Sequence, residues 1–503
     1  MSIRSFSVSN MLERNARLFN EKIAIEHDDR LITFGELLKQ VRCLSKALKE
    51  HGICKGDRIS VLSKNSDRAL LLYCVAAYIG AIIVPINTRL SLGEIQYILT
   101  DSDPKVVFLE SEFKDLTKST FLGLSPSKVF FMDDAVENFP LLTSLIDDRS
   151  AIEEAEELEG GDPYIISYTA AMQGQPRGAI ITHDNIISCS IQTAFTMGLN
   201  PEDVHLNILP FYHMLGLSMA LMVIHVGGKN ISVPKFDAQL TLNLISQRKV
   251  SLIGSFPPIL LSLLAKLQEG KYDLSSLKHA YGIEKPDVVE NFKRKTDCQF
   301  WSLYGQTGCM LPCLSNEKLG SAGSPGPLVD LIIADEYSRE VDAGESGEIL
   351  VRGPLVFQGY WKQPELTKHT LRNGWHHTGD MGRLDDDGYL WFMGRKEEKD
   401  LIKPGGENVY PVEVEKALLE HPDVQEAVVF GVPDPEYGEG IKGVCVIRQS
   451  AELSTQELID FVSNKIASYK KPRYISFVTS LPKTKDGSID RKMVKVNYST
   501  ENL

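Results

Sequence analysis

The sequence predicts an α/β protein: a large N-terminal domain of doubly wound sheets with a β-rich subdomain, and a small α+β C-terminal domain. Three observations support this prediction. The chain has 503 residues, which is too many for one hydrophobic core. Strand patterns alternate with helix patterns over residues 22–308, as in parallel sheets covered on both faces. A different pattern begins after a polar, glycine-containing stretch at 374–411, so we predict domains at 1–394 and 395–503.

The first elements are predicted from capping signals and apolar spacing. Thr33 and Glu36 have the spacing of a capping box, which begins a helix that ends near Gly52. Ser91 and Glu94 repeat this spacing and predict a second helix. Strands are expected at 22–26, 58–62 and 105–109.

One apolar run needs its own interpretation because of its length. Residues 69–86 are almost entirely apolar, but Gly80 and Pro85 interrupt the run. The part at 81–84 is short and rich in β-branched residues. We therefore predict a buried helix that turns into a buried strand, and not a membrane span.

A glycine-containing loop at 170–178 joins two predicted strands. It follows the strand pattern that ends at Thr169 and precedes a strand at 179–182 and a helix. Its backbone amides, the freedom of Gly174 and the cation of Arg177 would suit a phosphate group. Loops of this composition are also common as simple turns, so both interpretations stay open at this point.

Strand ends in the middle of the chain are candidate ligand contacts. Ligands of open α/β sheets bind beyond the carboxyl ends of strands, so Gly282 and the turn Tyr304–Thr307 are candidate pocket edges. The Tyr304 ring is available there to stack on a base. His213 follows a strand end that runs into an apolar helix at 208–217. A packed core histidine is the commoner interpretation of such a residue, and a pocket role is the alternative.

Composition and charge exclude some classes of partner. The chain is 43% hydrophobic and 24% charged, which is ordinary for a globular protein. The formal net charge of −13 disfavours nucleic acid or an anionic membrane as a partner. Among eight scattered cysteines only Cys309 and Cys313 lie close, without a second pair or a nearby histidine. Reduced buried thiols in a cytoplasmic protein are expected, and not disulfides or a zinc site.

The stretch 374–411 combines an acid in a predicted tight turn, a hairpin and a glycine turn. The acid is Asp380, and the hairpin is expected over 385–393. A charged run after Arg395 ends on Gly405–Gly406, which permits backbone conformations that other residues avoid. This order is typical of a chain that leaves one domain for another. Beyond it, helices are expected at 412–419 and 455–466 and strands at 425–431, 442–447 and 474–477.

Six motifs occur along essentially the whole chain in one order, at Leu209–Gly216, Tyr304–Thr307, Gly347–Tyr360, Thr378–Asp380, Gly394–Pro411 and Leu481–Arg491. In these motifs the chain resembles the adenylate-forming superfamily: acyl-CoA synthetases, firefly luciferase and peptide-synthetase adenylation domains. The wording GENVYP and the ending LPKTxxGxIxR are most similar to acyl-CoA synthetases. The resemblance implies an acyl-adenylate made from a carboxylate and ATP with Mg²⁺. The small C-terminal domain then rotates, and the thiol of CoA attacks.

The resemblance also implies roles for residues at matching positions. Asp380 is expected to hold the ribose hydroxyls, and Arg395 to lie near the ribose and phosphate. Thr307 is expected to bind the α-phosphate, and His213 to border the acyl pocket and the thiol path. The less favoured interpretation of Asp380 is a turn-capping acid. The other implied contacts are Tyr304 and Gly305 with Gly282, Ile283 and Glu284 at adenine, Thr169, Gly174 and Arg177 at the phosphates, and Gly405, Gly406 and Glu407 facing CoA.

Departures from the family pattern fall on residues that handle ATP. Residues 170–173 replace the usual Ser-Gly-Thr-Thr, and Arg177 stands for a lysine. Gly308 replaces the glutamate that helps to hold Mg²⁺, so no protein metal ligand is assigned. Ser488 stands where the adenylation lysine is expected, with Lys485 as our candidate replacement among nearby lysines. The segment from Arg395 to the glycine turn is also longer than usual.

Two functional hypotheses follow. The first is an AMP-dependent carboxylate–CoA ligase that forms an acyl-CoA through an acyl-adenylate, with reduced adenylation possible. The alternative is a degenerate member that binds nucleotide, acyl-adenylate or acyl-CoA without efficient ATP-driven adenylation. The expected partners are a small carboxylic acid, ATP or AMP, and coenzyme A, with no nucleic acid and no integral membrane association. The apolar segments near Phe211, Gly216 and Phe256 fit an aliphatic or aromatic acid.

Overall fold

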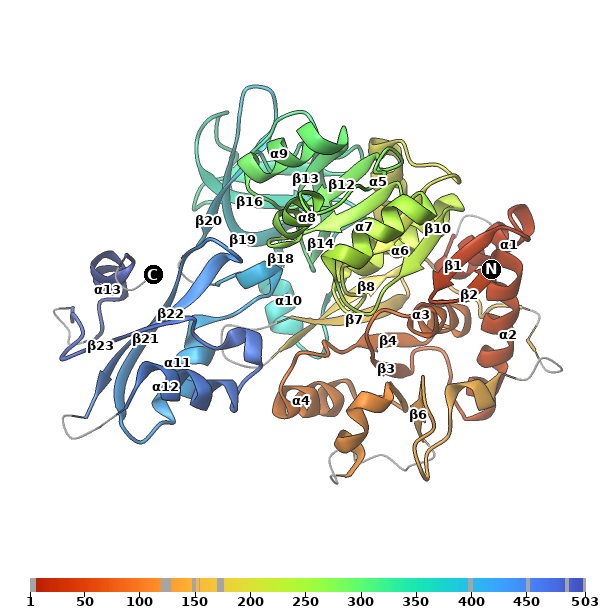
Figure 1. Cartoon of the computed structure of the whole chain (residues 1–503), viewed down its shortest axis with the longest axis horizontal. Helices are drawn as coiled ribbons and strands as arrows, with labels where there is room; N and C mark the ends of the chain where they lie inside the picture. The colour runs from red at the N-terminus through yellow and green to blue at the C-terminus, as the bar shows by residue number, and fades with distance from the viewer. Residues whose placement is uncertain are drawn as a thin grey trace.

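The structure is a computed structural model that describes residues 6–118, 128–146, 151–152, 154–169, 176–396, 401–448, 453–484 and 488–500. Over these residues the chain forms four β-sheets. Three of them belong to the N-terminal part. The fourth lies with the C-terminal helices on one side of the molecule, as Figure 1 shows in blue.

A seven-stranded sheet contains the first predicted βα units. Its order is β17-β8-β7-β4-β3-β5-β6, and β7, β4, β3, β5 and β6 run parallel. Strands β8 and β17 are antiparallel to their neighbours. The strands span Arg58–Leu62 (β3), Ile82–Pro85 (β4), Val106–Leu109 (β5), Val129–Phe131 (β6), Pro163–Thr169 (β7), Arg177–Thr182 (β8) and Gly359–Tyr360 (β17).

An eight-stranded sheet follows, in the order β14-β13-β12-β11-β9-β10-β1-β2. Its six inner strands are parallel, and the two edge strands are antiparallel. The strands span Ile23–His27 (β1), Arg30–Thr33 (β2), Val204–Asn207 (β9), Lys229–Ser232 (β10), Leu252–Ser255 (β11), His279–Gly282 (β12), Gln299–Gln306 (β13) and Cys309–Ser315 (β14).

Helices alternate with these strands along the chain, as the doubly wound prediction requires. They span Val8–Leu18 (α1), Phe34–Glu50 (α2), Asp67–Ile79 (α3), Leu92–Ser102 (α4), His183–Met197 (α5), Met214–Val226 (α6), Ala238–Arg248 (α7), Ile259–Leu267 (α8) and Pro286–Thr296 (α9). Both predicted capping boxes are present, at the starts of α2 and α4. The apolar run at 69–86 forms α3 and β4, and both are buried, so the prediction of a buried helix and strand is confirmed.

Helix α1 was not predicted, and its capping signal explains why. Ser7 is the N-cap, but the residue at the third helical position is Asn10 and not Glu or Gln. The Asn10 side chain accepts the Ser7 backbone N–H at 2.9 Å, as a glutamate would do. The capping box therefore forms here with asparagine at the third helical position, where the usual sequence signal has Glu or Gln.

The β-rich subdomain contains a five-stranded sheet, and it corrects one prediction. Strands Asp330–Ala334 (β15), Gly347–Arg352 (β16), Trp375–Leu384 (β19) and Leu371–Arg372 (β18) pair in that order, and Leu390–Arg395 (β20) pairs with β19. Helix α10 spans Pro364–Thr370. Asp380 was expected in a tight turn, but it lies inside β19. The pairing with β16 shifts register here and Gly379 has φ +68°, so the feature is a bulge and not a turn.

The C-terminal part has its own small core. Its sheet order is β21-β22-β23, with an antiparallel and a parallel pair. Buried side chains of the two helices α11 and α12 pack with this sheet as a separate cluster. The elements span Pro411–Leu419 (α11), Val424–Asp434 (β21), Gly438–Ile447 (β22), Thr455–Ser463 (α12), Tyr474–Val478 (β23) and Arg491–Tyr498 (α13).

The predicted fold class is thus confirmed, including the hairpin that joins β19 to β20. The boundary between residues 394 and 395 stays a prediction. All eight cysteines are free thiols, and only Cys54 is exposed. Within the part of the chain that the structure describes, every helix is too short or too polar to span a bilayer.

Candidate functional site

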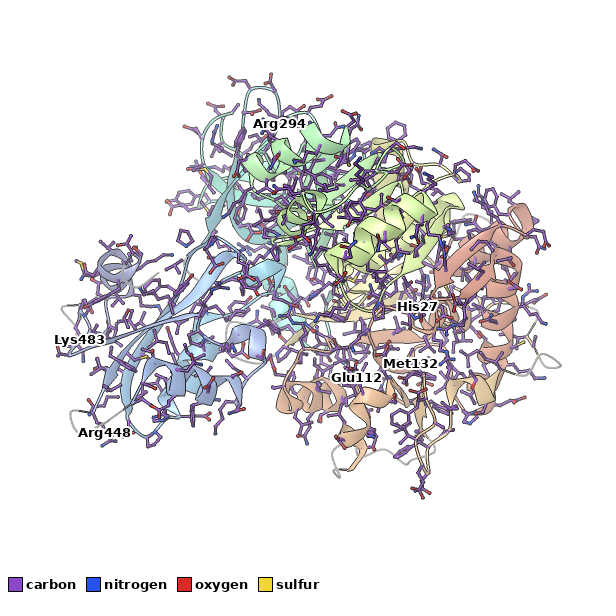
Figure 2. The ribbon with its side chains drawn as sticks, in the orientation of Figure 1. His27, Glu112, Met132, Arg294, Arg448 and Lys483 are labelled. Atoms are coloured by element: carbon purple, nitrogen blue, oxygen red, sulfur yellow. The ribbon has the colours of Figure 1, made fainter. Side chains whose placement is uncertain are left out.

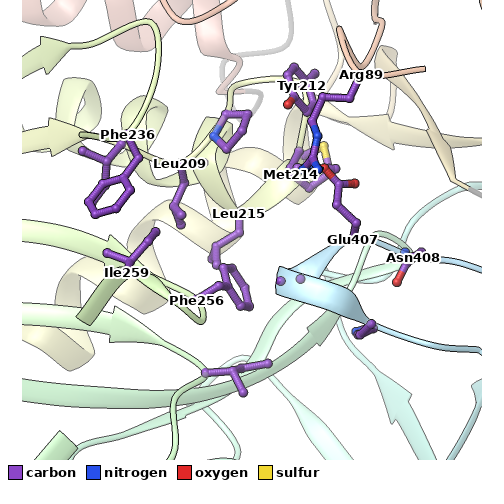
Figure 3. Close-up of a pocket in the computed structure, with 18 of the residues that line it drawn as sticks. Arg89, Leu209, Tyr212, Met214, Leu215, Phe236, Phe256, Ile259, Glu407 and Asn408 are labelled. Atoms are coloured by element: carbon purple, nitrogen blue, oxygen red, sulfur yellow. Dashed lines mark hydrogen bonds and ion pairs between the residues drawn. The ribbon is translucent and has the colours of Figure 1, made fainter. Parts of the chain in front are cut away.

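A cavity of about 810 Å³ lies where strand ends of both N-terminal sheets meet. Loops that follow β3 and β4 reach it from one sheet, and loops that follow β9, β11, β12 and β13 reach it from the other. This is the position expected for a ligand in open α/β sheets. Figure 3 shows the apolar walls formed by Leu209, Leu215, Phe236, Phe256 and Ile259, and the polar end with Arg89, Tyr212 and Glu407.

A glycine turn from the C-terminal part closes over this cavity. The turn spans Pro404–Gly406, and both glycines have positive φ, at +56° and +88°. A Cβ atom at Gly405 would lie 3.2 Å from the Tyr437 ring, and one at Gly406 would lie 3.3 Å from the Phe256 ring. Glycine at both positions is therefore required by backbone conformation and by the close approach to the cavity wall.

Glu407, directly after this turn, joins the two parts of the chain. Its side chain is only 5% exposed, and one oxygen lies 3.0 Å from Arg89 Nη1 and 3.2 Å from His213 Nε2. Asn87 donates to the other oxygen at 3.3 Å. Burial alone would raise the pKa of Glu407, but His213, Arg89 and Lys470 together lower it below its ordinary value. The carboxylate is thus held ionised between the cavity and the C-terminal part.

Lys470 makes a second buried connection between the two parts. Its side chain is 3% exposed and pairs with Glu413 at 2.6 Å and with Glu94 at the start of α4. Burial opposes the charge of Lys470, but the two carboxylates raise its pKa. Burial raises the pKa of Glu413, although Lys470 opposes this change. No local pattern in the sequence indicates this cluster.

Asp380 is held beside the cavity by polar side chains. Tyr304 donates its hydroxyl to Asp380 Oδ2 at 2.9 Å, and the Gln306 amide donates to the same oxygen. Arg395, at the paired position on β20, has its Nε 3.9 Å from Asp380 Oδ1. Its Nη1 also donates to the Leu401 carbonyl at 2.6 Å, which ties it to the start of the C-terminal part.

Glu348 on β16 fixes the bulge that carries Asp380. It accepts the Gly379 N–H at 2.9 Å, and its second oxygen lies 2.8 Å from Lys396 Nζ and 3.2 Å from His377 Nδ1. Burial would raise the pKa of Glu348, but Lys396, the Gly379 amide and His377 lower it. This buried carboxylate links the bulge that carries Asp380 to the residue that follows Arg395.

Eight of the sixteen predicted site residues line the large cavity or a neighbouring one of about 70 Å³. The large cavity is lined by His213, Ile283, Gly305, Thr307, Gly405, Gly406 and Glu407. Thr169, His213, Thr307 and Glu407 line the smaller cavity. Thr307 and His213 thus lie where the two cavities adjoin.

Other predicted residues lie behind the cavity wall. Glu284 points away from it, accepts the Ser255 hydroxyl at 2.6 Å, and has a pKa raised by burial. Gly282 has φ +149° and approaches the Ser255 carbonyl so closely that a Cβ would lie 1.8 Å from it. Tyr304 is buried, and its hydroxyl is engaged by Asp380. These three residues therefore support the cavity wall and do not line the cavity.

Arg177 pairs with Thr169 at the open end of the β7–β8 ladder. Its charge offsets part of the rise in pKa that burial causes at Tyr360 and Tyr410. The loop residues between the two strands, including Gly174 and the altered positions 170–173, lie outside the described residues.

Lys485, the candidate replacement lysine, also lies outside the described residues. Its described neighbours are far from the cavity. Ser488 is exposed and its hydroxyl lies 2.7 Å from that of Thr484. Lys483 pairs with Glu426 at 2.6 Å at the outer edge of the C-terminal part (Figure 2). In this arrangement the described residues on either side of Lys485 do not line the cavity.

Gly308, where a metal-binding glutamate was expected, is closed in by aromatic side chains. A Cβ atom there would lie 3.2 Å from His376 and from Phe357. Among the residues that the structure describes, no group of three or more His, Cys, Asp or Glu side chains is arranged to hold a metal ion.

Sequence reasoning missed several residues of the site. Arg89, Asn87 and Lys470 give no local signal, because their partners are distant in the chain. Glu348 lies in the motif Gly347–Tyr360, but nothing in its local pattern selects it for a function. The nearest signal is the chain position of Arg89, four residues after the last residue of β4.

Comparison with known families matches nearly the whole chain. The profile described as AMP-binding enzyme matches residues 12–361. A second profile, described as AMP-binding enzyme C-terminal domain, matches residues 413–488.

Individual relatives are similar over almost their full length. The long-chain-fatty-acid–CoA ligase of Bacillus subtilis (strain 168) is 32% identical, covering 99% of this chain and 95% of the relative. The feruloyl-CoA synthase of an Amycolatopsis species is 32% identical, covering 96% and 98%. A double mutant of o-succinylbenzoate CoA synthetase from Bacillus subtilis, solved with a bound product analogue, is 28% identical with a TM-score of 0.83, covering 97% and 98%.

Proposed function

The chain belongs to the AMP-binding enzyme family, and we propose that it is an AMP-dependent carboxylate–CoA ligase acting through an acyl-adenylate. The relatives named as CoA ligases support this class and give no support to the degenerate alternative. The observation that carries the proposal is the glycine turn at 404–406 closed over an apolar cavity beside His213 and Thr307.

Asp380 is proposed to hold the ribose of ATP or AMP. An ionised carboxylate accepts hydrogen bonds from both ribose hydroxyls, and Tyr304 with Gln306 keeps it oriented. Arg395 beside it supplies a cation near the phosphate. Thr307, at the junction of the two cavities, supplies a hydroxyl to the α-phosphate.

The acid is proposed to occupy the apolar part of the large cavity. Its walls are aliphatic side chains from α6, α8 and β14 together with Phe236 and Phe256 from loops, which suit an aliphatic or aromatic acid. The carboxylate then points toward Thr307 and His213, where the two cavities adjoin. Polar groups at one end and apolar walls at the other would orient the substrate for adenylation.

The arrangement of the two parts suits the second half-reaction, attack by the thiol of CoA. The glycine turn leaves little side-chain volume at the cavity mouth, which a thin pantetheine arm requires. The relative solved with a product analogue superimposes over 97% of this chain, including the C-terminal part. Exclusion of water by the closed turn protects the acyl-adenylate from hydrolysis.

Adenylation is proposed to need a different arrangement of the C-terminal part. Lys483 and Ser488 do not line the cavity, so residues 395–503 would rotate about the chain after Arg395 to bring Lys485 or a neighbour inward. Mg²⁺ would arrive bound to ATP phosphates, since position 308 offers no ligand atom. A cytoplasmic location is proposed from the free cysteines.

Product formation from a panel of acids tests the proposal. Purified protein is incubated with ATP, Mg²⁺, CoA and aliphatic or aromatic acids, and acyl-CoA, AMP and pyrophosphate are quantified. We expect acyl-CoA and AMP in equal amounts with at least one acid. ATP–pyrophosphate exchange without CoA measures adenylation alone. Absence of exchange with every acid, together with turnover of a supplied acyl-adenylate by CoA, would support the degenerate alternative.

A further inference from the structure

One buried side chain outside the family motifs contacts the loop that carries His213. Asn65 lies between β3 and α3 of the seven-stranded sheet and is 4% exposed. It reaches across to the loop between β9 and α6 of the other sheet. Its amide nitrogen donates to the carbonyls of Asn207 at 3.0 Å and Leu209 at 2.8 Å, and its oxygen accepts the Phe211 N–H at 2.7 Å.

These three bonds engage both donors and the oxygen of the amide and fix its orientation. Two carbonyls face the NH₂ group and one N–H faces the oxygen, so only one of the two flips satisfies all partners. The side chain borders the large cavity, but both of its donors are engaged by the loop. Asn65 is thus suited to hold the loop, and not to bind substrate.

The position of Asn65 is itself well fixed. Ser66 is the N-cap of α3, and its side chain accepts the Ala69 N–H at 3.1 Å. From the second turn of the same helix, Tyr73 donates its hydroxyl to the Phe211 carbonyl at 3.1 Å. Asn65 and the start of α3 therefore hold the loop through hydrogen bonds to both the N–H and the carbonyl of Phe211.

The loop in turn positions part of the apolar wall of the cavity and also His213, which borders the proposed path of the CoA thiol. Leu209 and Pro210 form part of the apolar wall. His213 ends the loop as the N-cap of α6 and contacts Glu407 at 3.2 Å. A shift of the loop moves these groups together, while Asp380 stands on a different sheet.

We propose that Asn65 is a positioning residue that holds the loop 207–213 so that the acyl wall and His213 meet the reacting carbonyl and the glycine turn. This inference rests on the proposed ligase function. Its consequence is selective, because the nucleotide contacts do not pass through the loop. Disturbing Asn65 should weaken use of the acid and of CoA while leaving use of ATP unchanged.

The test variant is Asn65→Asp, with Asn15→Asp as its matched control. Aspartate keeps the acceptor for Phe211 but loses both donors and places negative charge against two carbonyls. Asn15 is equally buried and also donates to two backbone carbonyls, Ile224 and His225, at the far end of α6. The two variants should therefore lose a similar amount of general stability, whereas only Asn65→Asp disturbs the loop beside the cavity.

The kinetic arm measures KM for acid, CoA and ATP separately in the full-length protein. We expect Asn65→Asp to raise KM for the acid or lower the rate of thiolysis by about tenfold to about a hundredfold, as for misplacement of about 1 Å. KM for ATP should stay unchanged, and Asn15→Asp should alter none of the three beyond its effect on thermal stability. Equal changes in all three constants, or equal changes in both variants, overturn the inference.

The second arm needs no activity. Hydrogen exchange of the backbone at 207–213 is measured in both variants, and in Tyr73→Phe as a milder change in case Asn65→Asp does not fold. We expect faster exchange in this segment for Asn65→Asp and Tyr73→Phe, and wild-type exchange there for Asn15→Asp. Unchanged exchange overturns the inference. If the wild-type protein makes no acyl-CoA, the proposed function fails and this arm alone decides the role of Asn65.

Discussion

At the scale of single residues, the site depends on buried carboxylates that cations and hydrogen-bond donors surround. Asp380, Glu348 and Glu407 are each nearly inaccessible to solvent. Cations or hydrogen-bond donors from other elements surround each of them. Burying a charge without such partners is strongly unfavourable, so each carboxylate depends on its neighbours being in place.

Asp380→Asn tests the ribose contact. The amide keeps the shape but replaces one acceptor oxygen with a donor, which faces the Tyr304 hydroxyl or the ribose. We expect KM for ATP to rise by about tenfold to about a hundredfold, the range for a lost hydrogen bond to a charged group. Steady-state kinetics with varied ATP measure this change. Asp387→Asn in the same hairpin is the control, because its side chain is 72% exposed. An equal rise in both variants would contradict the assignment.

Glu407→Gln tests the contact between the glycine turn and His213. Removing the charge leaves Arg89 and His213 without their shared anion, so the closed arrangement weakens. We expect thiolysis of a supplied acyl-adenylate to slow by about tenfold or more, with ATP–pyrophosphate exchange unchanged. Glu420→Gln, at an exposed pair in the same part of the chain, serves as the control. Loss of exchange to the same degree would show that the carboxylate does not act selectively.

At the scale of elements, α4 and α11 are joined through Lys470. The first turn of α4 contributes Glu94 and the first turn of α11 contributes Glu413, so two helix starts face one buried cation. Carboxylates are favourable at helix N-termini, and the shared lysine prevents their mutual repulsion. This cluster and Glu407 together stabilise the arrangement in which the glycine turn covers the cavity.

Lys470→Met should destabilise this arrangement. Breaking a buried ionic cluster by removing one partner costs about 3–5 kcal/mol, because the remaining charges stay buried. We expect faster proteolysis at the junction near residue 396 and slower thiolysis. In the double variant Glu94→Gln/Lys470→Met part of both effects should be recovered, since one uncompensated carboxylate is gone. Lys465→Met, at an exposed pair, is the control, and the same proteolysis rate in Lys470→Met and Lys465→Met would refute the role of the cluster.

At the scale of the whole molecule, buried histidines couple the N-terminal fold to pH. Burial lowers the pKa of His183 to about 4, of His205 to about 3 and of His225 to about 4, from an ordinary value of 6.5. His183 stacks on Tyr164, and its Nδ1 accepts the Val8 N–H at 3.3 Å. These rings are neutral in the folded state, and each joins separate segments of the chain.

The pH dependence of unfolding follows from these shifts. As pH falls below 6.5, the unfolded chain takes up protons on these histidines, while the folded chain does not until about pH 4. Stability is therefore lost progressively over this window and is unaffected above it. We expect the thermal unfolding temperature to fall between pH 6.5 and 4.5, and less so in His183→Phe. His51→Phe, at an exposed position, should keep the wild-type slope, and an unchanged slope in His183→Phe would contradict the argument.

The sequence by itself determined the fold class and most elements, because the signals for these are local. Capping boxes at Thr33 and Ser91 and the interrupted apolar run at 69–86 depend on neighbours a few residues away. The bulge at Asp380 was taken for a turn, because Gly379 signals positive φ in either setting. A local pattern does not show which strand pairs with the segment that carries Asp380.

The tertiary structure alone decided which side chains meet. Asn65 contacts residues 142 to 146 positions away, and Lys470 contacts Glu94 across 376 positions. Such contacts arise from how two sheets and the C-terminal part pack, and no periodicity or spacing along the chain encodes them. The sequence therefore points to the residues proposed to handle nucleotide and CoA, whereas packing alone showed what holds them in place.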